Sequence, residues 1–224
     1  EPKVEGKFVV RGRTLVFVPK ELKPSTIYTV TLKKSIAVKG TDPLKNDVVI
    51  QFETSPKQTE YSESSWYMNT SKAEFAPNGP MLFSIGSVDT AQEFTVKAFA
   101  FKSFDLYKKN FVKALEIPGW AFETNKTFVV PAADITLARE FSLKPQTYKQ
   151  EYSKYLVLPE NLPKGDYWIE ISSKNQTQHI FAEVTDMATY LDVTANKTLL
   201  WVNNLASKGP IQNAQVSLSS GLAL

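Results

Sequence analysis

Histidine and cysteine, two residue types often used in catalysis, are almost absent from this sequence. His179 is the only histidine among 224 residues, and there is no cysteine. A general base usually works beside a nucleophile and a carboxylate that orients it. The segment around His179, QHIFAEV, contains no such motif and has the composition of a strand. We therefore predict that His179 is an ordinary strand residue and that the chain has no catalytic residues and is not an enzyme.

Two aspartates, Asp42 and Asp47 in the segment TDPLKND, are the best candidates for a metal site. Their loop lacks the regular alternation of oxygen ligands found in dedicated calcium loops. One histidine without cysteine is also a poor basis for a zinc site. The nine glycines form no cluster that could cradle a phosphate. We therefore predict no metal site and no cofactor.

Two further groups of residues could act at the surface. Four Asn-x-Ser/Thr sequons could mark glycosylated loops or could equally be accidental. They lie at Asn69, Asn125, Asn175 and Asn196. Exposed tryptophans could stack on sugar rings, and the candidates are Trp66, Trp120 and Trp168.

The overall composition excludes two classes of partner. The 26 basic and 23 acidic side chains give a net charge of +3, and no stretch gathers them into the basic face that a nucleic acid requires. The longest apolar runs, such as LLWV and TLVFV, are far shorter than the roughly 18–20 residues that span a bilayer. We therefore expect a globular chain with no nucleic-acid partner and no membrane-spanning segment.

Short segments of β-branched and aromatic residues at the start of the chain predict a small sheet. The segments FVVRGRTLVFV (8–18), TIYTVTL (26–32) and VVIQFET (48–54) are each expected to be one strand. A polar segment, SPKQTEYSESS (55–65), follows them and is typical of a linker between domains.

Residues 66 to about 184 again contain short alternating segments separated by turn residues, which predicts a β-sandwich. One stretch differs, because its aromatic and aliphatic residues recur every three or four positions. These residues are Phe104, Tyr107, Phe111 and Leu115. We therefore predict one short helix near 104–116, packed on the sandwich by this stripe and ended by the segment IPGW.

Residues 6–54 resemble the C-terminal two thirds of a bacterial Ig-like domain. The resemblance is carried by a strand ending in Phe-x-Pro, then Leu-x-Pro-x-x-x-Tyr-x-Val, then a closing Phe-x-Thr. The opening strands of that family have no counterpart, since EPKVEG stands where the domain should already be half built. We therefore expect the chain to begin inside this domain.

A second segment is similar to the junction between consecutive macroglobulin-like domains of bacterial α2-macroglobulin-like proteins. In that family a Leu-Pro…Leu-Pro-x-Gly-x-Tyr hairpin closes one domain, and a Val-Thr-Asp linker opens the next with a Leu-Leu-Trp-Val strand and a Gly turn. The matching positions are Leu158, Pro159, Leu162, Pro163, Gly165, Tyr167, Val184, Thr185, Asp186, Leu199 to Val202, Gly209, Ala214 and Val216. Pro210 stands one residue earlier than the pattern places its proline, which affects the turn geometry but not the resemblance.

These resemblances imply an all-β chain of tandem Ig-like or fibronectin-III-like sandwich domains of the macroglobulin type. Residues 1–57 would be a partial bacterial Ig-like domain, and residues 58–185 a macroglobulin-like sandwich. Residues 186–224 would be the first strands of a further domain, whose remaining strands would lie beyond Leu224. Trp201, in the first hairpin of that domain, is then expected to be partly exposed.

The function implied by the resemblance is that of a non-catalytic N-terminal scaffold segment of an α2-macroglobulin-like endopeptidase inhibitor. In that family a bait segment is cleaved, and a Cys-x-x-Gln thioester captures the protease, so both parts would lie outside this cysteine-free chain. The implied partners are endopeptidases, through the full-length protein, and neighbouring domains of the same chain. The implied location is the cell envelope or the outside, as a periplasmic or surface-anchored lipoprotein. The alternative is an Ig-like cell-surface adhesion or glycan-binding module.

Overall fold

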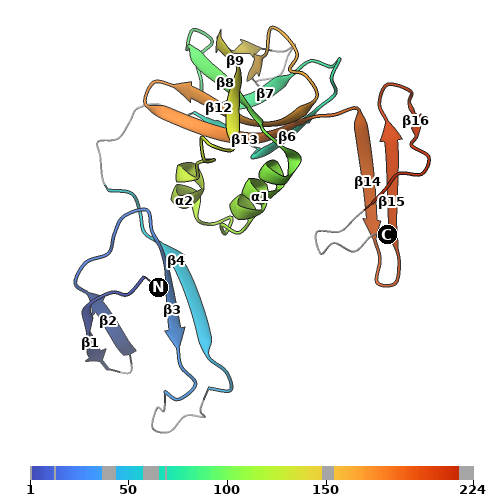
Figure 1. Cartoon of the computed structure of the whole chain (residues 1–224). Helices are drawn as coiled ribbons and strands as arrows, with labels where there is room; N and C mark the ends of the chain where they lie inside the picture. The colour runs from blue at the N-terminus through green and yellow to red at the C-terminus, as the bar shows by residue number, and fades with distance from the viewer. Residues whose placement is uncertain are drawn as a thin grey trace. The chain divides into compact units, whose positions relative to one another are not determined.

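The computed structural model describes residues 2–12, 14–36, 44–57, 66–68, 70–147 and 154–216. Strands dominate these residues and two short helices accompany them, so the predicted all-β sandwich class is confirmed (Figure 1). The chain forms two compact units. The smaller unit contains Glu1–Glu63 and Lys109–Val129, and the larger contains Ser64–Lys108 and Val130–Leu224.

The larger unit is built on a β-sandwich of two sheets. The strand order is β10-β11-β7-β5 in one sheet and β6-β13-β12-β8-β9 in the other, and all neighbours are antiparallel except β6 and β13. The strands are β5 (Tyr67–Met68), β6 (Lys72–Phe75), β7 (Leu82–Gly86), β8 (Phe94–Phe101), β9 (Ile135–Leu143), β10 (Gln146–Thr147), β11 (Lys154–Val157), β12 (Gly165–Ser173) and β13 (Gln176–Val184).

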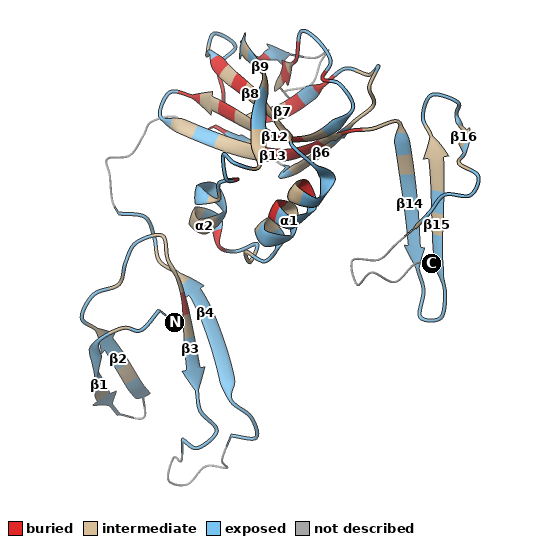
Figure 2. Ribbon diagram, viewed as in Figure 1, coloured by how far each residue is buried: buried red, intermediate tan, exposed pale blue. Residues whose placement is uncertain are grey.

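The core of this unit lies between the two sheets, where Figure 2 shows most of the buried residues. Alternate residues of β12 and β13 point inward, so that Ile169, Ile171 and Ile180 are fully buried. The indole of Trp66 meets the ring of Phe94 edge to face at a centroid distance of 5.1 Å. Burying each such side chain contributes roughly 1.5–3 kcal/mol, so this core is the main source of stability in the larger unit.

The entry into β12 has the geometry of a tyrosine corner, a feature of Greek-key sandwiches. The hydroxyl of Tyr167 donates a hydrogen bond to the carbonyl oxygen of Pro163 at 2.8 Å, four residues upstream. Gly165, between them, has φ +151°, a conformation that residues with a side chain rarely adopt. The family pattern quoted from the sequence therefore corresponds to a defined backbone turn.

Helix α1 (Phe104–Leu115) lies within the predicted range 104–116. Its first turn is capped by Ser103, whose Oγ accepts a hydrogen bond from the backbone N–H of Leu106 at 3.3 Å. The buried face differs from the predicted stripe, because Tyr107 and Asn110 are buried while Phe104 is 61% exposed. The spacing predicted the helix correctly, but one member of its buried face is the polar Asn110.

A second helix, α2 (Phe122–Thr127), was not predicted. Its six residues, FETNKT, are too few to display a helical period and carry no capping motif. The two helices have 12 and 6 residues, and within the described ranges we find none that is long and apolar enough to cross a bilayer.

The end of the described chain forms a small sheet of strand order β14-β15-β16. These strands are β14 (Met187–Val193), β15 (Thr198–Asn204) and β16 (Gly209–Pro210). β15 pairs along its length with β14 and also pairs with β16, which has only two residues. The hairpin that the sequence predicts around Gly209-Pro210 continues into residues 217–221, which lie outside the described residues, so it stays a prediction. The expected partial exposure of Trp201 is confirmed at 52%.

The smaller unit contains two hairpins, β1 (Gly6–Arg11) with β2 (Thr14–Pro19) and β3 (Ile27–Leu32) with β4 (Val48–Glu53). The prediction of one strand over 8–18 was wrong, because the segment folds back on itself at Gly12. Gly12 has φ +60°, a turn conformation that glycine adopts at little cost. The reversal brings the rings of Phe8 and Phe17 to a centroid distance of 5.1 Å.

Two of the three motif segments noted in residues 6–54 meet around Tyr28, which is buried. Its hydroxyl oxygen accepts a hydrogen bond from the backbone N–H of Lys23 at 2.8 Å. Thr54 Oγ1 accepts from the N–H of Thr26 at 3.0 Å and donates to the carbonyl of Lys23 at 2.6 Å. The Leu-x-Pro-x-x-x-Tyr and Phe-x-Thr segments are therefore joined by hydrogen bonds in space.

The domain boundaries 1–57, 58–185 and 186–224 stay a prediction. Most of the expected linker, residues 58–65, lies outside the described residues. Residues 109–129, which the prediction assigned to the second domain, belong to the smaller unit.

Replacing Tyr167 with Phe should remove the corner hydrogen bond and leave the ring in place. Since a typical buried hydrogen bond contributes about 1 kcal/mol, we expect the Y167F variant to lose about that much unfolding free energy in urea titrations. Tyr190 is an exposed tyrosine on β14, and the matched Y190F variant should change stability by less than about 0.5 kcal/mol. Equal effects of the two substitutions would contradict the role given to the corner.

Candidate functional site

His179, the only histidine, lies on β13 and points away from the core, because its neighbour Ile180 points inward. Its ring stacks on the indole of Trp168 with a centroid distance of 4.7 Å and an interplanar angle of 15°. Nδ1 is buried and has no hydrogen-bond partner among the described residues. Burial lowers the pKa of His179, and the negative charge of Glu170 opposes this in part. Among the described residues, Nδ1 therefore has no partner of the kind that orients a general base.

Asp47, the described member of the predicted metal pair, closes the loop between β3 and β4. Its Oδ1 accepts a hydrogen bond from the backbone N–H of Lys34 at 2.8 Å, and its Oδ2 accepts one from Lys33 Nζ at 2.9 Å. The bond from Lys34, followed by that from Lys33, lowers the pKa of Asp47. Asp42 lies outside the described residues. In the part of the chain that the structure describes, no three or more histidine, aspartate or glutamate side chains gather as a metal site would require.

The tryptophans proposed for sugar binding are mostly buried. Trp66 is 1% exposed and Trp168 is 2% exposed, whereas Trp120 is 43% exposed. Two of the three rings thus cannot offer a face to a sugar, which is a correction to the adhesion alternative. The cause is that Trp66 fills the core and Trp168 lies under the rings of its own sheet face.

The sequons differ in their surroundings. Asn175 and Asn196 are exposed and follow the ends of β12 and β14, in the turns to β13 and β15. The amide of Asn125 instead donates to the carbonyls of Ala121 at 2.8 Å and Pro118 at 3.1 Å, so it stabilises α2. Asn69 lies outside the described residues.

The passage from the sandwich to β14 is held by Asp186, and we call this contact the Asp186 junction. Lys164 Nζ donates to Asp186 Oδ2 at 2.5 Å, and the backbone N–H of Leu205, just after β15, donates to the Asp186 carbonyl at 2.6 Å. The preceding N–H of Thr185 donates to the carbonyl of Phe75 at 2.9 Å. The hydrogen bond from Lys164 is the main cause of a lowered pKa of Asp186. Phe75, Lys164 and Leu205, which are distant from one another in the sequence, thus all contact the connection between β13 and β14.

The smaller unit has a second carboxylate contact, formed by the side chain of Glu53 at the end of β4. Its Oε2 accepts from the backbone N–H of Glu123 at 3.0 Å. Its Oε1 accepts from the N–H of Thr124 at 2.7 Å and from the Thr124 hydroxyl at 2.6 Å. Burial alone would raise the pKa of Glu53, but these hydrogen bonds lower it. Glu53 therefore holds the first turn of α2, 71 residues further along the chain.

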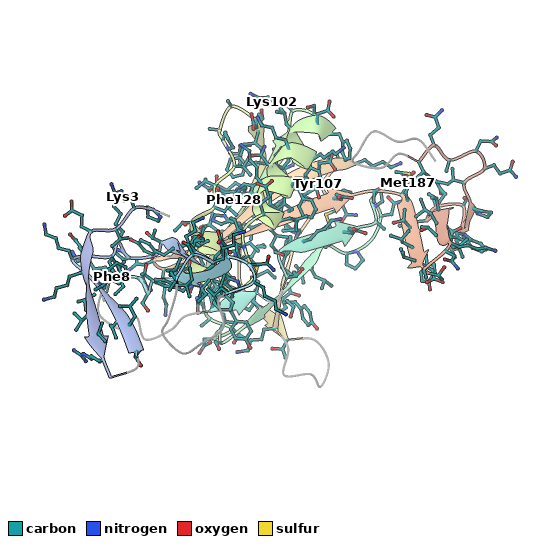
Figure 3. The ribbon with its side chains drawn as sticks, turned by 90° about the horizontal axis from the view of Figure 1, so that it is seen from below. Lys3, Phe8, Lys102, Tyr107, Phe128 and Met187 are labelled. Atoms are coloured by element: carbon teal, nitrogen blue, oxygen red, sulfur yellow. The ribbon has the colours of Figure 1, made fainter. Side chains whose placement is uncertain are left out.

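A third carboxylate, Glu183 on β13, anchors α1 through Tyr107, which Figure 3 labels. The hydroxyl of Tyr107 donates to Glu183 Oε1 at 2.7 Å, and Lys72 Nζ lies 3.3 Å from the same oxygen and 2.9 Å from Glu74. Burial and then the bond to Glu183 raise the pKa of Tyr107. Asp166, opposite Glu183 in the strand register, has a raised pKa because of its burial and the charge of Glu183.

These three contacts share one kind of chemistry: a carboxylate accepts hydrogen bonds from a segment distant in the sequence. Such groups position segments, because their lone pairs are occupied by donors of the chain itself. Sequence reasoning singled out Asp186, through the Val-Thr-Asp pattern, but missed Glu53 and Glu183. The only sequence signal for those two was their place inside quoted strand segments, Phe-x-Thr and QHIFAEV.

Exposed apolar side chains are concentrated on hairpins outside the sandwich core, which Figure 2 shows as mostly exposed. On one face of the β3–β4 hairpin, Val30 pairs with Ile50 and Leu32 pairs with Val48, and all four side chains are exposed. The opposite face carries mainly polar side chains such as those of Thr29 and Gln51. Contiguous apolar patches of this kind mark interaction surfaces in soluble proteins.

The β14–β15 hairpin differs because both of its faces are apolar. The pair Tyr190 and Trp201 lies on one face, and the pair Leu191 and Leu200 lies on the other. Tyr190, Leu191 and Trp201 are exposed.

No protein-family model matches the sequence, and no curated protein sequence is similar to it. Among solved structures, the chain is similar to native α2-macroglobulin from Escherichia coli spanning domains MG0-NIE-MG1, with 12% identity and a TM-score of 0.45, over 95% of this chain and 66% of that one. It is also similar to Escherichia coli α2-macroglobulin activated by porcine elastase, with 10% identity and a TM-score of 0.27, over 86% of this chain and 18% of that one. The chain thus spans just under two thirds of the first and less than a fifth of the second.

Replacing Glu53 with Gln should weaken the hold on α2, because one of the two acceptor oxygens becomes a donor. We expect E53Q to reduce the unfolding free energy of the smaller unit by about 1 kcal/mol and to speed amide exchange at Glu123 and Thr124. Because the pKa of Glu53 is lowered, its contribution should be present above about pH 4.5 and be lost as the pH falls through its folded pKa.

The matched control is Glu5→Gln, which affects an exposed ion pair with Lys20 at 3.5 Å. Exposed pairs contribute little, so E5Q should leave both measurements nearly unchanged. Unchanged exchange at Glu123 and Thr124 in E53Q would count against the contact.

Proposed function

We propose that this chain is a non-catalytic scaffold segment of an α2-macroglobulin-like endopeptidase inhibitor that traps proteases. Other parts of the full-length protein would supply the bait segment and the thioester. The full-length protein would act in the cell envelope or outside the cell. Its partners would be endopeptidases, and this segment itself would contact neighbouring domains of the same protein.

The observation that carries the proposal is the junction built from the quoted motif residues. Pro163, Gly165 and Tyr167 form the corner that opens β12, and Asp186 receives hydrogen bonds from Lys164 and Leu205. Pro163, Gly165, Tyr167 and Asp186, which are among the residues that support the family resemblance, therefore have structural tasks at one end of the sandwich. A pattern retained only by chance would not be expected to coincide with contacts of this kind.

The chemistry of the described residues supports positioning work. Covalent capture of a protease needs an activated acyl group and a nucleophile, and the cysteine of a thioester is absent from this sequence. The carboxylates Glu53, Glu183 and Asp186 are instead engaged with donors of the chain. Their hydrogen bonds tie together segments separated by up to 76 residues, as a scaffold must while another region is cleaved and rearranges.

The exposed apolar pairs support the second half of the proposal, contact with neighbouring domains. Interfaces within one chain bury patches of mixed polarity with an apolar centre. The Val30–Ile50 and Tyr190–Trp201 pairs supply such centres on two separate hairpins. Monomeric domains rarely keep large contiguous apolar patches exposed to water.

The test uses the chain and the full-length protein in parallel. The purified chain should leave a panel of endopeptidases fully active toward large protein substrates, because it has neither bait nor thioester. The full-length protein should protect large substrates from those proteases while small peptide substrates, which can diffuse into a trap, are still cleaved. Stoichiometric inhibition by the chain alone, or unimpeded digestion of large substrates with the full-length protein, would overturn the proposal.

A further inference from the structure

The outer face of the five-stranded sheet carries a row of charged residues that ends at His179. In the strand register, His179 lies opposite Glu170, Glu170 lies opposite Lys97, and Lys97 lies opposite Glu140. Lys97 Nζ and Glu140 Oε1 are 3.9 Å apart. The row therefore alternates in sign across four strands and ends in the one residue whose charge changes near neutral pH.

The surroundings of His179 favour its neutral form. The ring stacks against Trp168, and Nδ1 is buried with no acceptor within the described ranges. A neutral imidazole can leave one nitrogen without a proton, but an imidazolium carries N–H donors on both nitrogens. A charged ring would thus bury an N–H group without an acceptor, which costs free energy.

The aromatic rings beside His179 lead to the anchor of α1. Trp168 meets Phe181 at a tilt of 68° and a centroid distance of 4.9 Å, and Phe181 meets Tyr107 edge to face at 5.8 Å. Tyr107 lies in the first two turns of α1 and bonds to Glu183. Displacement of Trp168 by a charged His179 would therefore be transmitted through two ring contacts to α1.

We propose that His179 makes this sandwich acid-sensitive, and that protonation of its ring loosens the Trp168–Phe181–Tyr107 contacts that hold the start of α1. This device is separate from the scaffold role and goes beyond it. The sensing residue lies on β13, and the responding segment is Phe104–Lys108.

Burial, and not the charged groups around His179, determines the sign of the effect. Glu170 on β12 is the facing carboxylate and would attract an imidazolium, but its Oε1 already accepts a hydrogen bond from Trp168 Nε1 at 3.2 Å. Lys97 and Glu140 lie further along the row, and Glu183 and Lys72 lie beside Tyr107 at the other end of the ring contacts. Burial outweighs the charge of Glu170 and lowers the pKa of His179.

A lowered pKa means that the unfolded chain binds the proton more readily than the folded chain. The contribution of His179 to the unfolding free energy should therefore be constant above about pH 6.5, the usual histidine pKa, and should fall as the pH drops below that value. The loss levels off once the pH is below the folded pKa of His179. For each unit by which the pKa of His179 in the folded chain lies below its usual value, the ratio of folded to unfolded protein at low pH falls by about tenfold.

The first measurement is direct because the chain has a single histidine. An NMR titration of the His179 ring protons in the wild-type protein should give a pKa below 6.5. A pKa at or above 6.5 would overturn the proposal without the need for a variant.

The second measurement compares the wild type with His179→Gln in urea titrations between pH 7.5 and 5. The wild type should lose more stability across this window than H179Q does, and because the contributions of other groups are common to both proteins, the difference between the two profiles reports His179. Amide exchange at residues 104–108, corrected for intrinsic rates, should accelerate on acidification only in the wild type. Parallel pH profiles, or exchange at 104–108 that does not depend on His179, would overturn the proposal.

Discussion

The face-to-face packing of two sheets around Trp66, Phe83 and Ile169 is the constraint on which the larger unit depends. Because side chains of a strand alternate between its faces, burying Ile169 and Ile180 forces Trp168, His179 and their neighbours onto the outer face. The aromatic and charged side chains on that outer face must then find their packing and ionic partners there. Packing one face of β12 and β13 therefore fixes what the other face can carry.

Because of the same alternation, two adjacent aromatic residues of β12 point to opposite faces of the sheet and have different roles. Tyr167 points inward at the edge of the core, where its hydroxyl reaches the carbonyl of Pro163. Trp168 points outward, where it stacks on His179 and meets Phe181. A shift of register by one residue would exchange the two and destroy both the corner and the anchor of α1.

Local patterns in the sequence predicted the strands and helix α1 better than they predicted the contacts between distant segments. Period two predicted the strands of the sandwich, and spacings of three and four predicted α1, because both signals are contained within a few residues. The turn at Gly12 was missed because only the three residues RGR separate the strand-forming segments FVV and TLVFV. The predicted buried face of α1 differs from the observed one because the polar Asn110 is buried. Helical spacing of apolar residues cannot predict the burial of a polar residue, which depends on its surroundings in the fold. The contacts of Glu53 and Glu183 join residues 71 and 76 positions apart, so only the folded register could reveal them.

The β14–β15 and β3–β4 hairpins differ in how apolar side chains are distributed over their two faces. Leu199, Leu200, Trp201 and Val202 form an unbroken apolar run, so that both faces of β15 are apolar. Strands with one solvated face alternate between apolar and polar residues, whereas continuous apolar strands are typical of sheets covered on both sides. The β3–β4 hairpin, in contrast, has one apolar and one mainly polar face. The first pattern suits a strand covered on both faces, and the second suits a strand with one covered face and one face in contact with solvent.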